Sequence, residues 1–124
     1  MSTQNRSFEL SKTASEDLSG SQYYIVQMDS AGAAELAEGA LDFIIGVLQN
    51  KPESGQEAHV RFLGVSKVKI GGTVNIGDFV TTNTTAEGIA TTTDGNIVIG
   101  RAITAGVDGD VIEVQMSIEH LYIA

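Results

Sequence analysis

An internal repeat constrains the fold of this chain more than any other feature of its sequence. Three pairs of identical residues are each separated by 54 positions (100 − 46, 109 − 55, 114 − 60): Gly46 and Gly100, Gly55 and Gly109, Val60 and Val114. The segment "FIIGVLQNKPESGQEAHVRF" aligns with "IVIGRAITAGVDGDVIEVQM" at this offset, and "YYIVQMD" lies roughly over "DFVTTN". We therefore expect two pseudo-repeats, each made of four short strands, which can pack together and cover the sheet edges that a single unit leaves exposed.

Short apolar runs predict strands rather than helices. From residue 23 onward they recur every eight to twelve residues, separated by Gly, Asp, Asn and Ser. Segments such as "VSKVKI" alternate apolar and polar residues, which is typical of a half-buried strand. The best helical candidate, "GAAELAEGALD", is interrupted by Gly39. We expect an all-β domain over residues 23–124, a small β-barrel or sandwich.

The first 22 residues differ from the rest, because they are polar and rich in Ser and Thr. We interpret residues 1–22 as a flexible N-terminal arm. The stretch "RSFEL" at 6–10 alternates as a strand does and places Phe8 and Leu10 on one face. Such a segment can add itself to the sheet edge of a partner. An ordinary frayed terminus is the alternative.

Charge and composition exclude several functions. The net charge is −9 and the seven basic residues are scattered, with Lys67 and Lys69 on one strand face as the nearest approach to a basic patch. We expect neither nucleic acid nor an anionic membrane as a partner, and interpret these lysines as a solvated strand face. The N-terminus lacks the apolar core of a signal peptide, and "FIIGVL" is too short to span a membrane. The absence of Cys rules out disulfides and thiolate metal sites.

Catalytic or metal-binding chemistry is not indicated by any motif. "IGGTVNIGD" lacks the Lys-Ser/Thr ending of a phosphate loop and is better interpreted as a turn. Asp108, Asp110 and Glu113 form a hard-cation set in principle, but Asp-Gly also marks a hairpin. His59 and His120 have no companions at metal-ligand spacing. We expect no catalytic residues, no metal and no cofactor.

Several motifs resemble those of a known family. They are "IGVLQN" with a following Pro-x-x-Gly loop, "VRFLGVSKV", the "GGTVNIGD" turn, and "IGRAITAG-VDGDVIEV". Together, over residues 22–116, they resemble the small head decoration proteins of tailed bacteriophages, also called capsid cement proteins. The resemblance implies a barrel or tulip-like β-domain on the outer surface of the matured head. It also implies a structural virion protein, made in the host cytoplasm, that binds the major capsid protein as a trimer and stabilises the shell.

Contact residues are expected in the two terminal segments. We expect Arg6, Phe8 and Leu10 of the arm to contact the capsid. Three apolar residues beyond the repeat are expected in the oligomer interface: Leu121, Tyr122 and Ile123. Alternatively, that tail is the last barrel strand. A receptor- or glycan-binding module of a phage fibre is the rival function, although the sequence has no Trp and only three Tyr to stack on sugars. A housekeeping β-domain within a larger complex is a third interpretation.

Overall fold

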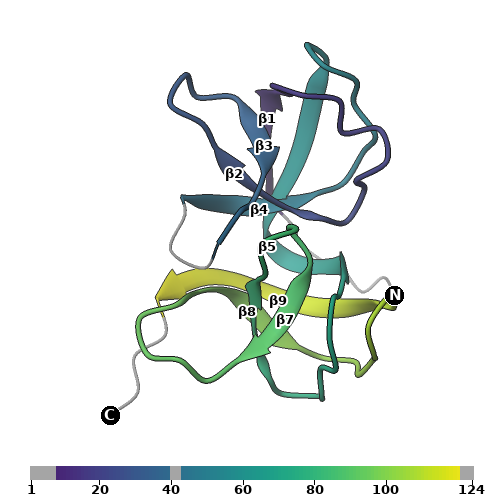
Figure 1. Ribbon diagram of the computed structural model, residues 1–124, viewed down its shortest axis with the longest axis vertical. Coiled ribbons are helices and arrows are strands. Elements are labelled where there is room, and N and C mark those ends of the chain that lie inside the picture. Colours follow the sequence, from purple (N-terminus) through teal and green to yellow (C-terminus); the bar gives the residue numbers. More distant parts are fainter. Residues whose placement is uncertain (1–7, 40–42, 121–124) are drawn as a thin grey trace, which may run out of the picture.

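The computed structural model describes residues 8–39 and 43–120, and the described chain is all-β, as the sequence predicted (Figure 1). It contains nine strands: β1 (Phe8–Thr13), β2 (Ile25–Met28), β3 (Ala34–Leu36), β4 (Ile44–Leu48), β5 (Glu57–Lys69), β6 (Phe79–Thr82), β7 (Gly88–Thr91), β8 (Ile97–Ala102) and β9 (Val111–His120). No described residue is helical.

The nine strands form a single curled antiparallel sheet. Its order is β3-β2-β4-β5-β9-β8-β6-β7, and β1 pairs with β5 beside this path. The sheet curls into one half-barrel above and one below in Figure 1, with β5 passing from the upper to the lower. Two isolated parallel bridges, Ala14 with Ala34 and Ile70 with Gly88, tie the end strands β3 and β7 back to the sheet. Most sheet edges are therefore covered, which limits uncontrolled strand pairing.

The predicted repeat is present in the strand pairing itself. Strands β2 to β5 correspond to β6 to β9, and their registers agree at the same offset of 54. In the first half Val26 pairs with Leu36, and in the second half Val80 pairs with Ala90. Val47 opposite Arg61 is likewise matched by Arg101 opposite Gln115.

The repeated glycines of β4 and β8 occupy positions that only glycine fits. Gly46 has φ 149° and Gly100 has φ 154°. A Cβ on Gly46 would collide with the Arg61 carbonyl oxygen and lie 2.7 Å from Val60 Cγ1. A Cβ on Gly100 would collide with the Gln115 carbonyl oxygen. Each glycine thus lets its strand approach the neighbouring backbone where the sheet bends.

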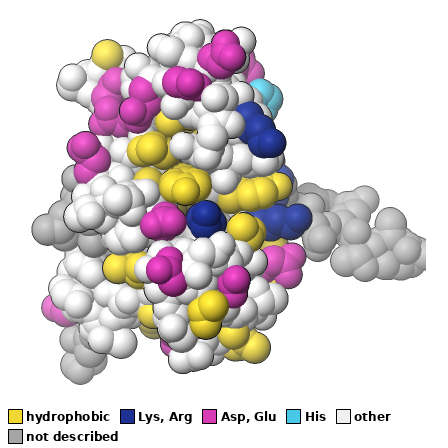
Figure 2. All heavy atoms as spheres, turned by 45° about the vertical axis from the view of Figure 1, so that its right-hand side comes forward, with side chains coloured by type: hydrophobic (Ala, Val, Ile, Leu, Met, Phe, Trp, Pro, Cys, Tyr) yellow, Lys and Arg dark blue, Asp and Glu magenta, His cyan; other side chains and the backbone are white. Residues whose placement is uncertain are grey.

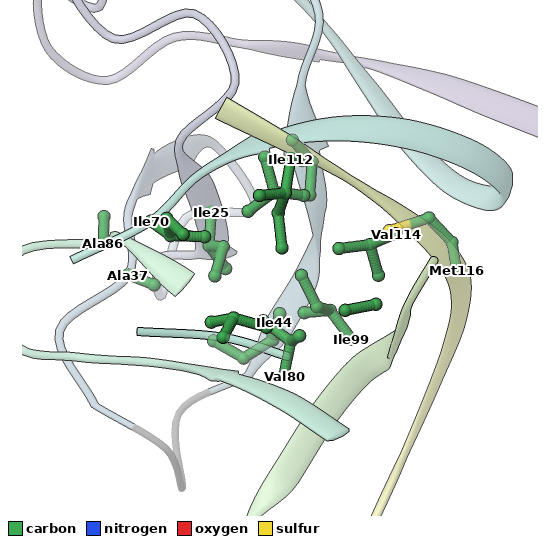
Figure 3. Packing of buried hydrophobic residues seen from close by; sticks show 14 residues of the cluster. Ile25, Ala37, Ile44, Ile70, Val80, Ala86, Ile99, Ile112, Val114 and Met116 are labelled. Atoms are coloured by element: carbon green, nitrogen blue, oxygen red, sulfur yellow. The ribbon is translucent and has the colours of Figure 1, made fainter. Parts of the chain in front are cut away.

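Each half has its own apolar core. The first contains eight buried residues: Ala14, Leu18, Val26, Ala34, Ile45, Leu48, Ala58 and Val60. The second core contains their counterparts Ile70, Val74, Val80, Ile99, Ala102, Ile112 and Val114, while Gly88 stands where the first half has Ala34. Figure 3 shows Ile25 and Ile44 of the first half among these residues, so the second core also joins the two halves.

The prediction of a flexible arm over residues 1–22 is wrong for the residues that the structure describes. The Ala14 amide donates to the Gln56 carbonyl and the Ile70 amide to the Asp110 carbonyl, at 2.8 and 2.9 Å. Likewise, Leu18 donates to the Pro52 carbonyl and Val74 to the Gly106 carbonyl. Residues 8–18 are therefore the opening segment of the first repeat, equivalent to the end of β5 and the loop after it.

The strand predicted around Phe8 and Leu10 exists, but its partner belongs to the same chain. Phe8 lies opposite Leu63 and Leu10 opposite Val60, so β1 pairs with the N-terminal part of β5, and β9 pairs with β5 from Leu63 onward. Polar composition misled the sequence interpretation, because β1 is an edge strand with alternate side chains in solvent. Leu18, buried completely, fixes the loop that follows.

Replacing either repeat glycine by alanine should strongly destabilise the domain. We expect Gly46→Ala and Gly100→Ala each to lower the free energy of unfolding by about 3 kcal/mol or more, because a Cβ meets backbone at a glycine-only φ. Gly20→Ala is the control, since a Cβ there has no atom within 4 Å, and should change stability by less than about 0.5 kcal/mol. Denaturant unfolding measures all three; a neutral Gly100→Ala would contradict the close approach.

Removing β1 should destabilise the free protein. We expect deletion of residues 1–13 to lower the melting temperature by at least about 6 °C, because it exposes a β5 edge and the side of the first core. Ser11→Ala, an exposed position on the same strand, is the control and should melt like the unaltered chain. If the deletion variant melts at the same temperature as the unaltered chain, residues 1–13 are dispensable for stability, as a flexible arm would be.

Candidate interaction surface

The terminal residues predicted as contacts divide between described and undescribed parts of the chain. Arg6, Leu121, Tyr122 and Ile123 lie outside the described residues. Leu10 is half-buried and packs against the first core, which leaves little of it for a partner. Phe8 is 51% exposed, so its predicted contact with the capsid stays a prediction that the fold permits.

Phe8 belongs to a small apolar patch at the junction of β1 and β9. Its ring lies 6.4 Å from that of Phe62, centroid to centroid, and it pairs with Leu63, which is also exposed. Beside them the Arg61 guanidinium binds the Glu9 carboxylate at 2.6 Å. Because Leu63 pairs with Ser117 as well, this patch marks the point where β1 and β9 meet on one strand.

An open cleft of about 530 Å³ adjoins this patch. Its lining comes from both halves: Leu63, Phe79, Val98, Gly100, Arg101, Gln115, Met116, Ser117 and Glu119. The Arg101 guanidinium lies 4.7 Å from the centroid of the Phe79 ring and its Nε donates to the Gly77 carbonyl. At the position equivalent to Gln115, the first half has Arg61, whose Nη1 reaches the Val65 carbonyl at 2.8 Å.

Two acidic residues of the second half, Asp78 and Asp110, close turns. The Asp78 carboxylate accepts from the Asn75 amide, and the Asp110 carboxylate from the Val107 amide, each at 2.9 Å. Gln56 Oε1 makes the same bond to the Glu53 amide in the first half. Because a neutral side chain performs this role there, the Asp110 contact needs no cation. Within residues 8–39 and 43–120 no three Asp, Glu, His or Cys side chains are placed to hold a metal ion.

The other titratable candidates are structural contacts on the surface. His59 Nε2 lies 3.2 Å from the Glu57 carboxylate, and both side chains are exposed. The Glu16 carboxylate accepts from the Leu36 amide, and hydrogen bonds from Ser19 hold the pKa of Asp17 below its usual value. Each buried side-chain nitrogen or oxygen of the described chain has a hydrogen-bond partner. No unsatisfied group marks a ligand site there.

The two lysines of the strand face each cover a tyrosine ring. Lys67 Nζ lies 5.8 Å from the centroid of Tyr23, and Lys69 Nζ lies 5.7 Å from that of Tyr24. Both rings are half-buried. Sugar-binding aromatics need an open ring face, and in each of these rings one face already lies near a lysine. Tyr23 also has φ 72°, where the second half has Gly77 at φ 90°.

Four exposed aliphatic side chains lie at one end of the second half. Their exposed fractions are 71% for Ile76, 42% for Ile103, 57% for Val107 and 48% for Val111. We call these four residues the aliphatic end. They lie on the turn before β6, the loop after β8 and the start of β9, which meet at the lower right of Figure 1. Figure 2 turns that side forward and shows hydrophobic side chains beside acidic ones on its lower part. Sequence reasoning missed this surface, although a comparison of the two repeats position by position would have found it.

Comparison with known proteins places this fold in a phage context. A family model described as "Phage cement protein" matches residues 2–118. A search of curated proteins finds no match. Among solved structures, the chain is similar to the head fiber gp8.5 N base of bacteriophage phi29, at 17% identity and a TM-score of 0.68, covering 95% of this chain and 100% of that one. At this identity the similarity shows a shared fold.

The family match identifies a phage structural protein, here a β-domain of two half-barrels with exposed apolar patches. More particularly, the chain belongs to the phage cement protein family, because the family model spans nearly its whole length. The resemblance seen in its glycine and valine motifs is thereby confirmed. The described residues contain no helix that could span a membrane.

Proposed function

We propose that this chain is a non-enzymatic virion protein that binds the outer surface of a matured phage head and stabilises the shell. Its partner is the major capsid protein, and it acts without a cofactor. The observation that carries the proposal is the match of the phage cement family over residues 2–118. The structural similarity to a base domain of a phage head fibre supports a head-bound role.

The physical properties of the chain suit this work. A protein that reinforces a shell has to resist deformation, and here two cores are joined through one continuous sheet. Free molecules also have to resist aggregation at high concentration until their sites appear. A net charge of −9 on each chain provides repulsion that opposes aggregation.

We further propose that the chain forms a trimer through its C-terminal tail. Leu121, Tyr122 and Ile123 continue the sequence beyond the repeat, and three apolar residues at the end of an acidic chain need a cover. A closed ring of identical copies provides one, because each copy covers the tail of its neighbour.

Binding to heads tests the main proposal. Purified protein added to matured heads that lack it should bind saturably, label the outer surface in electron micrographs, and raise the temperature at which heads release DNA. Immature heads are the matched control and should bind at least about tenfold more weakly, since their sites have not formed. Failure to bind matured heads would refute the proposal.

Deleting residues 121–124 tests the trimer. The shortened chain keeps β9 to its end, so its circular dichroism should stay unchanged while native mass spectrometry shows a shift from trimer to monomer. Leu63→Ser, at the patch beside β1, is the control and should remain a trimer. If the trimer persists after the deletion, or if the shortened chain unfolds, the tail belongs to the barrel and not to the trimer interface.

A further inference from the structure

The aliphatic end differs from its counterpart in the first half at every one of its four positions. The equivalent residues are Gln22 for Ile76, Gln49 for Ile103, Glu53 for Val107 and Glu57 for Val111. Matching backbone contacts establish these equivalences. For example, the Gln49 amide donates to the His59 carbonyl as the Ile103 amide donates to the Glu113 carbonyl. One architecture therefore carries four polar side chains in one copy and four aliphatic ones in the other.

The fold does not need aliphatic residues at these positions. In the first half Gln22 Nε2 donates to the Gln49 carbonyl at 2.9 Å, and Gln49 Nε2 donates to the Ser66 hydroxyl at 2.8 Å. Glu53 and Glu57 are exposed to solvent. Since the same turns form with polar residues, folding does not explain the exposed aliphatic residues of the second half. Contact with a partner outside the domain explains them.

The turns that carry Ile76 and Val107 are each held by several hydrogen bonds. The Asp78 amide donates to the Asn75 carbonyl and the Asp110 amide to the Val107 carbonyl, in addition to the two carboxylate contacts described above. Val74 and Gly106 join the two turns by a pair of hydrogen bonds of 3.0 Å each. A surface held in this way loses little conformational entropy when it binds, which favours a docking anchor.

The border of the aliphatic end is acidic. Segments 71–78 and 103–113 contain Asp78, Asp108, Asp110 and Glu113 and no Lys, Arg or His. Two basic residues contact these segments. Lys69 pairs with Val111, and Arg101 donates to the Gly77 carbonyl. The complementary partner is a protein surface with an apolar centre and Lys or Arg around it.

We infer that the aliphatic end is the face of this protein that docks on the phage head, against an apolar site bordered by basic side chains. This inference rests on the proposed function and names its contact surface. A second copy of this chain is a poorer occupant, because two such ends would bring acidic borders together on molecules that already repel each other. The end is also distinct from the Phe8, Phe62 and Leu63 patch, which lies beside β1.

The test gives the second half the residues of the first. Ile76→Gln, Val107→Glu and the double variant are titrated against matured heads beside the unaltered chain. Each should fold with an unchanged melting temperature, because the first half accepts these residues in the same turns. We expect each single variant to bind at least about tenfold more weakly and the double variant more weakly still. Phe43→Ser, which makes an exposed apolar residue of the first half polar, is the matched control and should bind normally.

Three further readouts make the outcome decisive. Val107→Ile keeps an aliphatic side chain and should bind as the unaltered protein does. Binding of the unaltered chain should weaken from low to high salt, since an acidic border faces basic residues. Folded variants that bind as well as the unaltered chain would overturn the inference while leaving the proposed function standing. Variants that change the oligomeric mass in solution would overturn it in favour of a second copy, and an unaltered chain that fails to bind heads would overturn both.

Discussion

The structure depends on one strand that serves both halves. β5 pairs with β1 through Glu57–Leu63 and with β9 through Leu63–Lys69. Its N-terminal part closes the first repeat and its C-terminal part opens the second. Each core is therefore bounded by a segment of the same continuous strand, and Val60 and Val68 of β5 are buried on opposite sides of that junction. Mechanical load on one half-barrel passes to the other through covalent backbone and a ladder of hydrogen bonds, which would be useful in the proposed role on a phage head.

A comparison of the two repeats distinguishes the residues that the fold requires from those that are available for function. Features found in both copies, such as the glycine approach at Gly46 and Gly100 or the side-chain contact to the Val107 amide, are required for this fold. Features found in one copy need another explanation. By this comparison Asp110 belongs to turn structure, because Gln56 replaces it, whereas the four aliphatic residues of the second half have no architectural counterpart. A single chain thus provides the contrast that usually requires homologous sequences.

Much of the fold was predictable because its signals are periodic and local. Glycine spacing predicted the two halves, alternation predicted the strands, and the Asp-Gly pairs predicted turns. The role of residues 8–22 was not predictable in the same way. β1 is stabilised by pairing with residues about 50 positions away, and its alternate side chains face solvent, so its composition resembles that of a free terminus. The aliphatic end was not predictable for a related reason. Ile76 and Val107 occur singly among Gly and Asp, and only the fold brings their turns together.

An acidic protein with an exposed aliphatic end has to avoid two failures. In the proposed role, a lower charge would let the aliphatic ends of free molecules associate, and a polar end would remove the anchor that we infer. Net repulsion acts over a Debye length of about 8 Å at physiological salt, whereas apolar contact acts only when surfaces touch. On this proposal, charge selects a basic partner and the aliphatic end prolongs its binding. A partner with basic residues around an apolar site meets both conditions at once, while the aliphatic end of another copy is opposed by its own acidic border.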